Sequence, residues 1–273
     1  MRKLIKTAVI GILAATTILG ATACSNTKDD SKEVRVGVVG SNTDVWDYVV
    51  KKVEKEDGIK IKLVKFSDYN QPNKALSNGD LDLNAFQHRI FLDNYNKETK
   101  DNLTPIGDTF IAPLGIYSEK VKKPLELKNG AKIVIPNDVT NEGRSLKLLE
   151  TAGLIKVDPK AGIFATPKDI VENGKNLEIT PVDASQTARS IKDADAVIVN
   201  SGIAVDAGMI PTKDAIFLEP VNKDSKPYIN IIVARENDKD KEVFKKIVKA
   251  YQSDDVKKVM KETSKDSSIP AWE

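Results

Sequence analysis

Short apolar runs alternate with amphipathic segments along most of this chain, which is the pattern of alternating strands and helices. The β-branched run Val34–Val39 predicts a strand, and apolar side chains then recur at helical spacing over residues 45–53. Residues 59–65 alternate between apolar and polar side chains, as a half-buried strand does. A strand, a helix and a second strand in this order predict parallel strands with helices packed on the sheet.

The same pattern continues to the end of the chain and divides it into two α/β units. We expect strands over 81–86, 110–117 (broken by Pro113), 132–136, 195–200 and 229–234, and helices over 72–78, 90–97, 142–151, 201–206 and 240–261. A second unit begins at residue 132, and the last strand and helix return to the first unit. We therefore expect one lobe from 34–117 plus 219–273 and another from 118–218.

The first residues predict export from the cytoplasm. A basic head is followed by an uncharged stretch, Thr7–Ala23, with an apolar middle about the length of a signal h-region. Small residues then precede a cleavage point, and the pattern favours a secretory signal over a transmembrane anchor. The single cysteine follows as Ala21-Thr-Ala-Cys24, which resembles the bacterial lipobox, in which the cysteine becomes the lipidated first residue. The alternative is a plain secreted protein with an incidental cysteine.

Removal of residues 1–23 leaves a nearly neutral exported protein. The signal takes three basic side chains with it, so the formal charge changes from +2 to −1. Residues 24–33 contain no apolar side chain to bury after Cys24, and they predict a flexible tether. A diacyl anchor, with palmitate as one expected chain, gives stable attachment. We expect a lipid-anchored protein on the extracytoplasmic face of the cell membrane.

Composition and motifs argue against several classes of function. With 42 basic and 40 acidic side chains there is no excess of positive charge to indicate a nucleic-acid partner. One histidine and one cysteine cannot build the usual structural zinc sites. The chain has no nucleophile elbow, no phosphate-binding loop and no dinucleotide fingerprint. We expect neither an enzyme nor a cofactor or metal, although a serine with a lysine base stays open.

Unusual polar and aromatic residues gather in two segments, Asp68–Asn73 and Asn84–Arg89. Both lie at the ends of predicted strands, where open α/β sheets bind their ligands. Tyr69, Phe86 and His88 are candidates for a pocket. An aromatic residue at a strand end also fits a hydrophobic core, and this alternative stays open.

Six short segments, in order along the chain, together resemble the methionine-binding lipoproteins of the NlpA family. They are Tyr69–Asn73, Gly79–Asp82, Asn84–His88, Asn141–Arg144, Asp193–Asn200 and Lys226–Asn230. Members of that family are extracytoplasmic solute receptors of ABC importers. The resemblance implies a two-lobed, type II periplasmic-binding-protein fold with the ligand in a cleft between the lobes. It also implies L-methionine as the favoured ligand, a membrane permease and its ATPase as partners, and action as a monomer.

The resemblance also assigns roles to residues. It makes Arg144 the residue that holds the ligand carboxylate, and a planar guanidinium suits that role because it offers two parallel donors. We expect Arg144 just inside a helix start, where backbone N–H groups favour an anion. The alternative is a surface arginine in the first turn of a helix.

The remaining assignments divide into polar and apolar contacts. Asn200 and Asn230 match contacts to the ligand backbone, although each could instead satisfy neighbouring backbone groups at a lobe junction. Tyr69, Phe86 and His88 correspond to the side-chain pocket. Phe91 stands near a further aromatic position, and aromatic rings suit a polarizable thioether. A receptor for another amino acid or a short methionine-containing peptide, and a surface adhesion protein on the same fold, remain as alternatives.

Overall fold

The computed structural model describes residues 33–272, which lie within one compact unit. The predicted signal peptide 1–23, Cys24 and all of the predicted tether except Glu33 lie outside the described residues. Within 33–272, no helix has the length and apolar character needed to cross a membrane.

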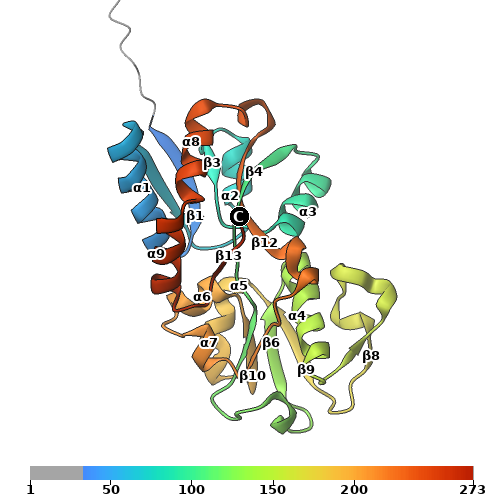
Figure 1. Ribbon diagram of the computed structural model, residues 1–273. Coiled ribbons are helices and arrows are strands. Elements are labelled where there is room, and N and C mark those ends of the chain that lie inside the picture. Colours follow the sequence, from blue (N-terminus) through green and yellow to red (C-terminus); the bar gives the residue numbers. More distant parts are fainter. Residues whose placement is uncertain (1–32, 273) are drawn as a thin grey trace, which may run out of the picture. The chain divides into compact units, whose positions relative to one another are not determined.

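The first lobe is built on a six-stranded sheet with the strand order β13-β4-β12-β3-β1-β2 (Figure 1). Its strands are β1 (Val34–Val39), β2 (Ile61–Phe66), β3 (Leu83–Asn84), β4 (Leu103–Ile111), β12 (Ile229–Arg235) and β13 (Ile269–Pro270). Its helices are α1 (Asp44–Asp57), α2 (Pro72–Ser77), α3 (Arg89–Thr99), α8 (Glu242–Tyr251) and α9 (Asp254–Ser264). Because β1 pairs in parallel with both β2 and β3, the predicted strand–helix–strand unit is confirmed.

Helices cover both faces of this sheet, so its central strands are buried on both sides. α1, α8 and α9 pack together on one face, and α2 and α3 cover the other (Figure 1). α1 turns Trp46, Val49 and Val53 inward, which are spaced at three and four residues along one helical stripe. It ends at Gly58, whose φ of 67° is the left-handed conformation that glycine adopts without strain.

The second lobe is built on a five-stranded sheet with the order β11-β5-β10-β6-β9. Its strands are β5 (Gly115–Tyr117), β6 (Lys132–Pro136), β9 (Glu178–Val182), β10 (Ala196–Val199) and β11 (Phe217–Leu218), with a small sheet of β7 (Lys156–Val157) and β8 (Ile170–Glu172) beside it. Its helices are α4 (Val139–Thr151), α5 (Ala184–Thr187), α6 (Ser201–Asp206) and α7 (Pro211–Asp214). Short 3-10 helices lie at Pro124–Glu126, Pro159–Phe164, Pro167–Asp169, Ala188–Lys192, Lys223–Tyr228 and Glu236–Asp238.

Two expected elements are each divided in the structure. The strand expected over 110–117 is two strands in different sheets, since β4 ends at Ile111 and β5 pairs with β10 and β11. The sheets therefore change at residues 112–114 and not after 117, around Pro113, which has no N–H to continue a ladder. The helix expected over 240–261 is α8 and α9, which are separated at Gln252 and Ser253.

The chain passes from the first lobe to the second through residues 112–114 and returns through residues 219–228. These two segments are tied together where they cross, because the N–H of Glu219 donates to the carbonyl of Leu114 at 2.9 Å. The connection between the lobes is thus a pair of neighbouring backbone segments.

Candidate functional site

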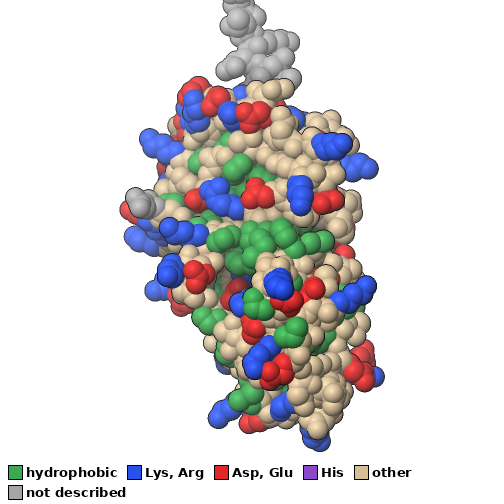
Figure 2. Space-filling model, turned by 90° about the vertical axis from the view of Figure 1, so that its right-hand side faces the viewer, with side chains coloured by type: hydrophobic (Ala, Val, Ile, Leu, Met, Phe, Trp, Pro, Cys, Tyr) green, Lys and Arg blue, Asp and Glu red, His purple; other side chains and the backbone are tan. Residues whose placement is uncertain are grey.

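A cavity of about 720 Å³ lies between the two lobes and is lined by residues of both. All the residues predicted as a ligand site line it: Tyr69, Phe86, His88, Phe91, Arg144, Asn200 and Asn230. Arg144 and Asn200 come from the second lobe, and the others come from the first. On the face shown in Figure 2, hydrophobic side chains gather in a band at mid-height, between areas with more charged side chains. The volume falls within the usual range of small-molecule sites.

Three rings form an aromatic wall at one side of this cavity. Phe86 lies 6.0 Å from Tyr69 and 5.7 Å from Phe91 between ring centroids, and Tyr69 lies 6.2 Å from Phe91. The rings are tilted or edge-on, which is the geometry that aromatic pairs prefer. All three are half-buried and border the cavity instead of joining the buried cores. Burial raises the pKa of Tyr69, so its phenol stays neutral.

His88 links the aromatic wall to the polar part of the site. It caps α3, where its Nδ1 accepts a hydrogen bond from the N–H of Phe91 at 3.2 Å. An accepting Nδ1 places the proton on Nε2, which lies 3.4 Å from the side-chain oxygen of Asn141. Burial lowers the pKa of His88 to about 3, with a further contribution from the positive charge of Arg144. His88 is therefore a neutral donor at physiological pH.

Asn141 joins the two lobes and was not among the predicted site residues. Its amide nitrogen donates to both oxygens of the Asp138 carboxylate, each at 3.0 Å. Because a carboxylate only accepts, this contact fixes the amide orientation and leaves Asn141 Oδ1 as the acceptor for His88 and for the amide of Asn200 at 3.0 Å. The sequence signal for Asn141 was its place three residues after a helix cap, within a segment already singled out.

The side chain of Asn200 has one hydrogen-bonding group in use and one that the described residues leave without a partner. Its Nδ2 is used by Asn141, and its buried Oδ1 has no hydrogen-bond partner among the described residues. A buried acceptor left unmatched costs about 1–3 kcal/mol. The Nδ2 of Asn230 donates to the carbonyl of Phe110 at 3.3 Å, which fits the expected alternative of satisfying nearby backbone.

Arg144 is buried, with its side chain 5% exposed, and is held on two sides. Its Nε and Nη2 donate to the carboxylate of Glu219 at 2.9 and 2.5 Å, and Nη2 also donates to the carbonyl of Ala112 at 3.0 Å. The ring of Tyr228 lies 4.2 Å from the guanidinium carbon. Only Nη1 has no hydrogen-bond partner within residues 33–272. Arg144 thus keeps one nitrogen for a further acceptor.

The position of Arg144 differs from the expectation in one respect. α4 begins at Val139, three residues earlier than predicted, because the carboxylate of Asp138 accepts the N–H of Asn141 at 3.0 Å and caps the helix. Arg144 therefore lies in the second turn of α4, beyond the free N–H groups of the helix start. Glu219 was also missed, since nothing in the local sequence pairs a residue after a short strand with an arginine 75 positions earlier.

At another side of the cavity, the carboxylate of Asp206 connects the lobes. It accepts hydrogen bonds from the N–H groups of Ser41 and Asn42 at 3.0 and 2.9 Å, and from the Ser41 hydroxyl at 2.7 Å. The approach is close because Gly40 has no side chain, and a Cβ there would lie 2.2 Å from a carboxylate oxygen of Asp206. Asp206 ends α6 in the second lobe, whereas residues 40–42 follow β1 in the first.

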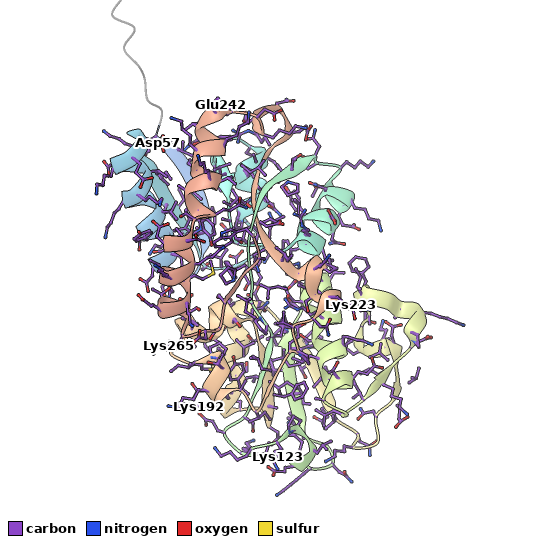
Figure 3. All side chains as sticks on the ribbon, viewed as in Figure 1. Asp57, Lys123, Lys192, Lys223, Glu242 and Lys265 are labelled. Carbon is purple, nitrogen blue, oxygen red and sulfur yellow. The ribbon has the colours of Figure 1, made fainter. Side chains whose placement is uncertain are left out.

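Many other charged side chains lie on the outside of the molecule and away from the cavity. Those labelled in Figure 3 are all exposed and none lines the cavity: Asp57, Lys123, Lys192, Lys223, Glu242 and Lys265. In the part of the chain that the structure describes, no group of three or more histidine, cysteine or acidic side chains is placed to hold a metal ion. The buried part of the cavity thus offers hydrogen-bonding groups, the guanidinium of Arg144 and an aromatic wall.

Comparison with known proteins shows that this chain resembles others in both sequence and fold. The pattern of the NlpA lipoprotein family matches residues 34–272. The D-methionine-binding lipoprotein MetQ of Salmonella typhimurium is 43% identical over 235 residues, which cover 85% of each protein.

Solved structures agree with this match. A nutrient binding protein from Burkholderia cenocepacia, bound to methionine, is 43% identical with a TM-score of 0.84, covering 88% of this chain and 100% of that one. The substrate binding protein of a methionine transporter from Streptococcus pneumoniae is 42% identical with a TM-score of 0.83, covering 88% and 96%.

Proposed function

This chain belongs to the NlpA lipoprotein family, and from that premise we propose that it is a solute receptor that binds methionine between its lobes and delivers it to an ABC permease. The relatives that carry methionine in their names or in their bound state support this choice of ligand. L-methionine is the favoured form, and the name of the Salmonella relative adds D-methionine as a ligand to test.

The observation that carries the proposal is a pair of unmatched groups at one cavity. Arg144 offers Nη1 as a donor, and Asn200 offers Oδ1 as a buried acceptor without a partner among the described residues. An α-amino acid carries an acceptor and a donor on the same carbon, as carboxylate and ammonium. It matches both groups at once and removes the cost of leaving a buried acceptor unpaired.

The aromatic wall supplies the selectivity for the ligand side chain. Tyr69, Phe86 and Phe91 border the same cavity as Arg144, so a side chain attached to the bound zwitterion can reach their rings. A thioether gains about 0.3–1.5 kcal/mol from each contact with an aromatic ring, in addition to its burial. His88 and Asn230 complete the polar surroundings.

We propose that the two lobes close around the ligand. Residues 112–114 and 219–228 are the only stretches through which the described chain passes between the sheets, and a pair of neighbouring segments can serve as a hinge. In the open form the cleft is wet, and the ligand binds one wall; closure then satisfies its other end and removes water, which strengthens the contact to Arg144. The permease recognises the closed shape.

The remaining parts of the proposal concern the surroundings of the receptor. Lipid on Cys24 anchors the protein at the extracytoplasmic face of the membrane, and residues 25–33 act as the tether. The anchor keeps the receptor close to the permease and its ATPase, which raises the frequency of encounters. We propose that the protein has no catalytic activity, because the names of its relatives describe binding proteins. We also propose that it acts as a monomer.

Titration calorimetry on ligand-free protein tests the proposed function. The protein is unfolded, dialysed and refolded to remove retained ligand, and then titrated with L-methionine, D-methionine, alanine and a dipeptide that contains methionine. One methionine bound per chain is the expected result. Tighter binding of alanine or of the dipeptide would change the ligand, and no heat with any of the four would favour the surface adhesion protein.

A further inference from the structure

An ion pair between Arg144 and Glu219 lies at the hinge, beside the ligand site. Both oxygens of Glu219 are engaged, since one accepts from Arg144 Nε and the other accepts from Arg144 Nη2 and, at 3.0 Å, from the N–H of Leu114. Glu219 lies behind the guanidinium, outside the set of residues that line the cavity. Its position at the crossing of the two hinge segments holds it there.

This pairing leaves the one buried cation of the cavity, Arg144, with its charge already balanced. The positive charge of Arg144 is balanced by the negative charge of Glu219, whose side chain is 17% exposed. Burial keeps His88 neutral at physiological pH, because its pKa is lowered to about 3. The other charged residues that line the cavity, Lys65, Arg189 and Asp206, are exposed to water and screened.

A ligand with net charge therefore meets a binding site whose buried cation, Arg144, is already balanced by Glu219. A free carboxylate without an ammonium would bring one uncompensated negative charge into it, and an amine without a carboxylate would bring one positive charge. A zwitterion brings none, and its two charged ends reach Arg144 Nη1 and Asn200 Oδ1.

We infer that Glu219 is a specificity-determining residue, which restricts the site to zwitterionic amino acids by balancing the positive charge with which Arg144 alone would attract anions. It acts through Arg144 and without touching the ligand, so it is a positioning residue as well as a charge balance. This inference rests on the proposed function, because it concerns the ligand of the same site.

Three ligands of the same shape and different charge test it. They are methionine, with no net charge; 4-(methylthio)butanoate, with net charge −1; and methioninamide, with net charge +1. The dissociation constant of each is measured by calorimetry for the native protein, for Glu219→Gln and for Glu219→Asp. Glu219→Gln removes the charge with little change of size, and Glu219→Asp keeps the charge with a shorter reach.

In the native protein we expect both charged analogues to bind at least about 100-fold more weakly than methionine. In Glu219→Gln, 4-(methylthio)butanoate should gain about tenfold or more relative to methionine, and methioninamide should lose a similar factor. The missing ammonium contact to Asn200 weakens the anionic analogue equally in both proteins, so the change in the ratio isolates the charge of Glu219. In Glu219→Asp both ratios should stay within about threefold of the native values.

Unchanged ratios in Glu219→Gln, with all three ligands weakened equally, would overturn the inference and leave Glu219 a purely structural residue. If Glu219→Gln does not fold, the native protein still tests the inference. Binding of 4-(methylthio)butanoate with a dissociation constant within tenfold of that of methionine would then overturn it. Native protein that binds none of the three ligands overturns the proposed function itself, so the two failures are distinguishable.

Discussion

The contact between Asp206 and residues 41–42 should stabilise the closed form of the receptor, and Asp206→Asn should weaken methionine binding. The carboxylate accepts three hydrogen bonds at 2.7–3.0 Å from the other lobe. An asparagine has one accepting oxygen, and its amide would place N–H groups against the N–H groups of Ser41 and Asn42. Because the contact exists only when the lobes meet, its loss acts on closure and not on the ligand contacts.

The size of this effect follows from the exposure of the contact. Hydrogen bonds to a charged group contribute about 1.5–3 kcal/mol when buried, and exposed ion-type contacts contribute less than about 1 kcal/mol. Asp206 is exposed but anchored at three points, so we expect a loss of about 1–2 kcal/mol, which corresponds to binding about 5- to 30-fold weaker.

The assay is titration calorimetry together with small-angle X-ray scattering at saturating methionine. Asp214→Asn is the matched control, because Asp214 is also an exposed carboxylate of the second lobe but accepts only from the N–H of Ile210, the residue just before its own helix α7, at 2.7 Å. We expect the control to bind as the native protein does. Equal affinities for native protein and Asp206→Asn would show that the contact plays no part in closure.

Three further changes test separate parts of the site. Arg144→Ala should weaken methionine binding at least about 100-fold and lower the free energy of unfolding by about 3 kcal/mol, because it leaves Glu219 buried without its partner; calorimetry and urea denaturation measure the two effects, and unchanged affinity would refute the role of Arg144. Phe86→Ala should weaken methionine about tenfold more than alanine, since the lost contact is to the ligand side chain; equal losses for both in the same titrations would count against the aromatic wall. His88 has a lowered pKa in the folded state, so the unfolded chain takes up a proton near pH 6.5 that the folded protein does not take up until about pH 3, and stability is lost as the pH falls through this window. Between pH 7.5 and 5 this group should remove about 2 kcal/mol of unfolding free energy, and His88→Asn, which can still cap α3, should show a correspondingly flatter dependence in urea titrations; parallel curves would contradict the assigned burial.

The elements that the sequence predicted well are those whose pattern is local. The β-branched run of β1 and the helical stripe of α1 each bury one continuous set of side chains, and their pairing in parallel followed from chain order. β9 was missed because its residues alternate weakly and only half-bury in the structure. The division of the last helix was missed because apolar side chains recur on both sides of Gln252 and Ser253. The helical backbone, however, ends at Tyr251 and begins again at Asp254.

For the site, residue types could be predicted but their mutual contacts could not. The resemblance pointed to Arg144 and Asn200, and each turned out to line the cavity. The partner of each comes from a distant part of the chain, since Glu219 follows Arg144 by 75 positions and Asn141 precedes Asn200 by 59. A pairing across 75 positions leaves no local trace in a single sequence.

A crystal structure of this protein with methionine tests the central claim most directly. We expect one methionine in the cavity between the lobes, with its carboxylate within hydrogen-bonding distance of Arg144 Nη1, its ammonium on Asn200 Oδ1 and its thioether against Phe86. Methionine bound elsewhere, or bound in the cavity with neither charged end on these two atoms, would contradict it.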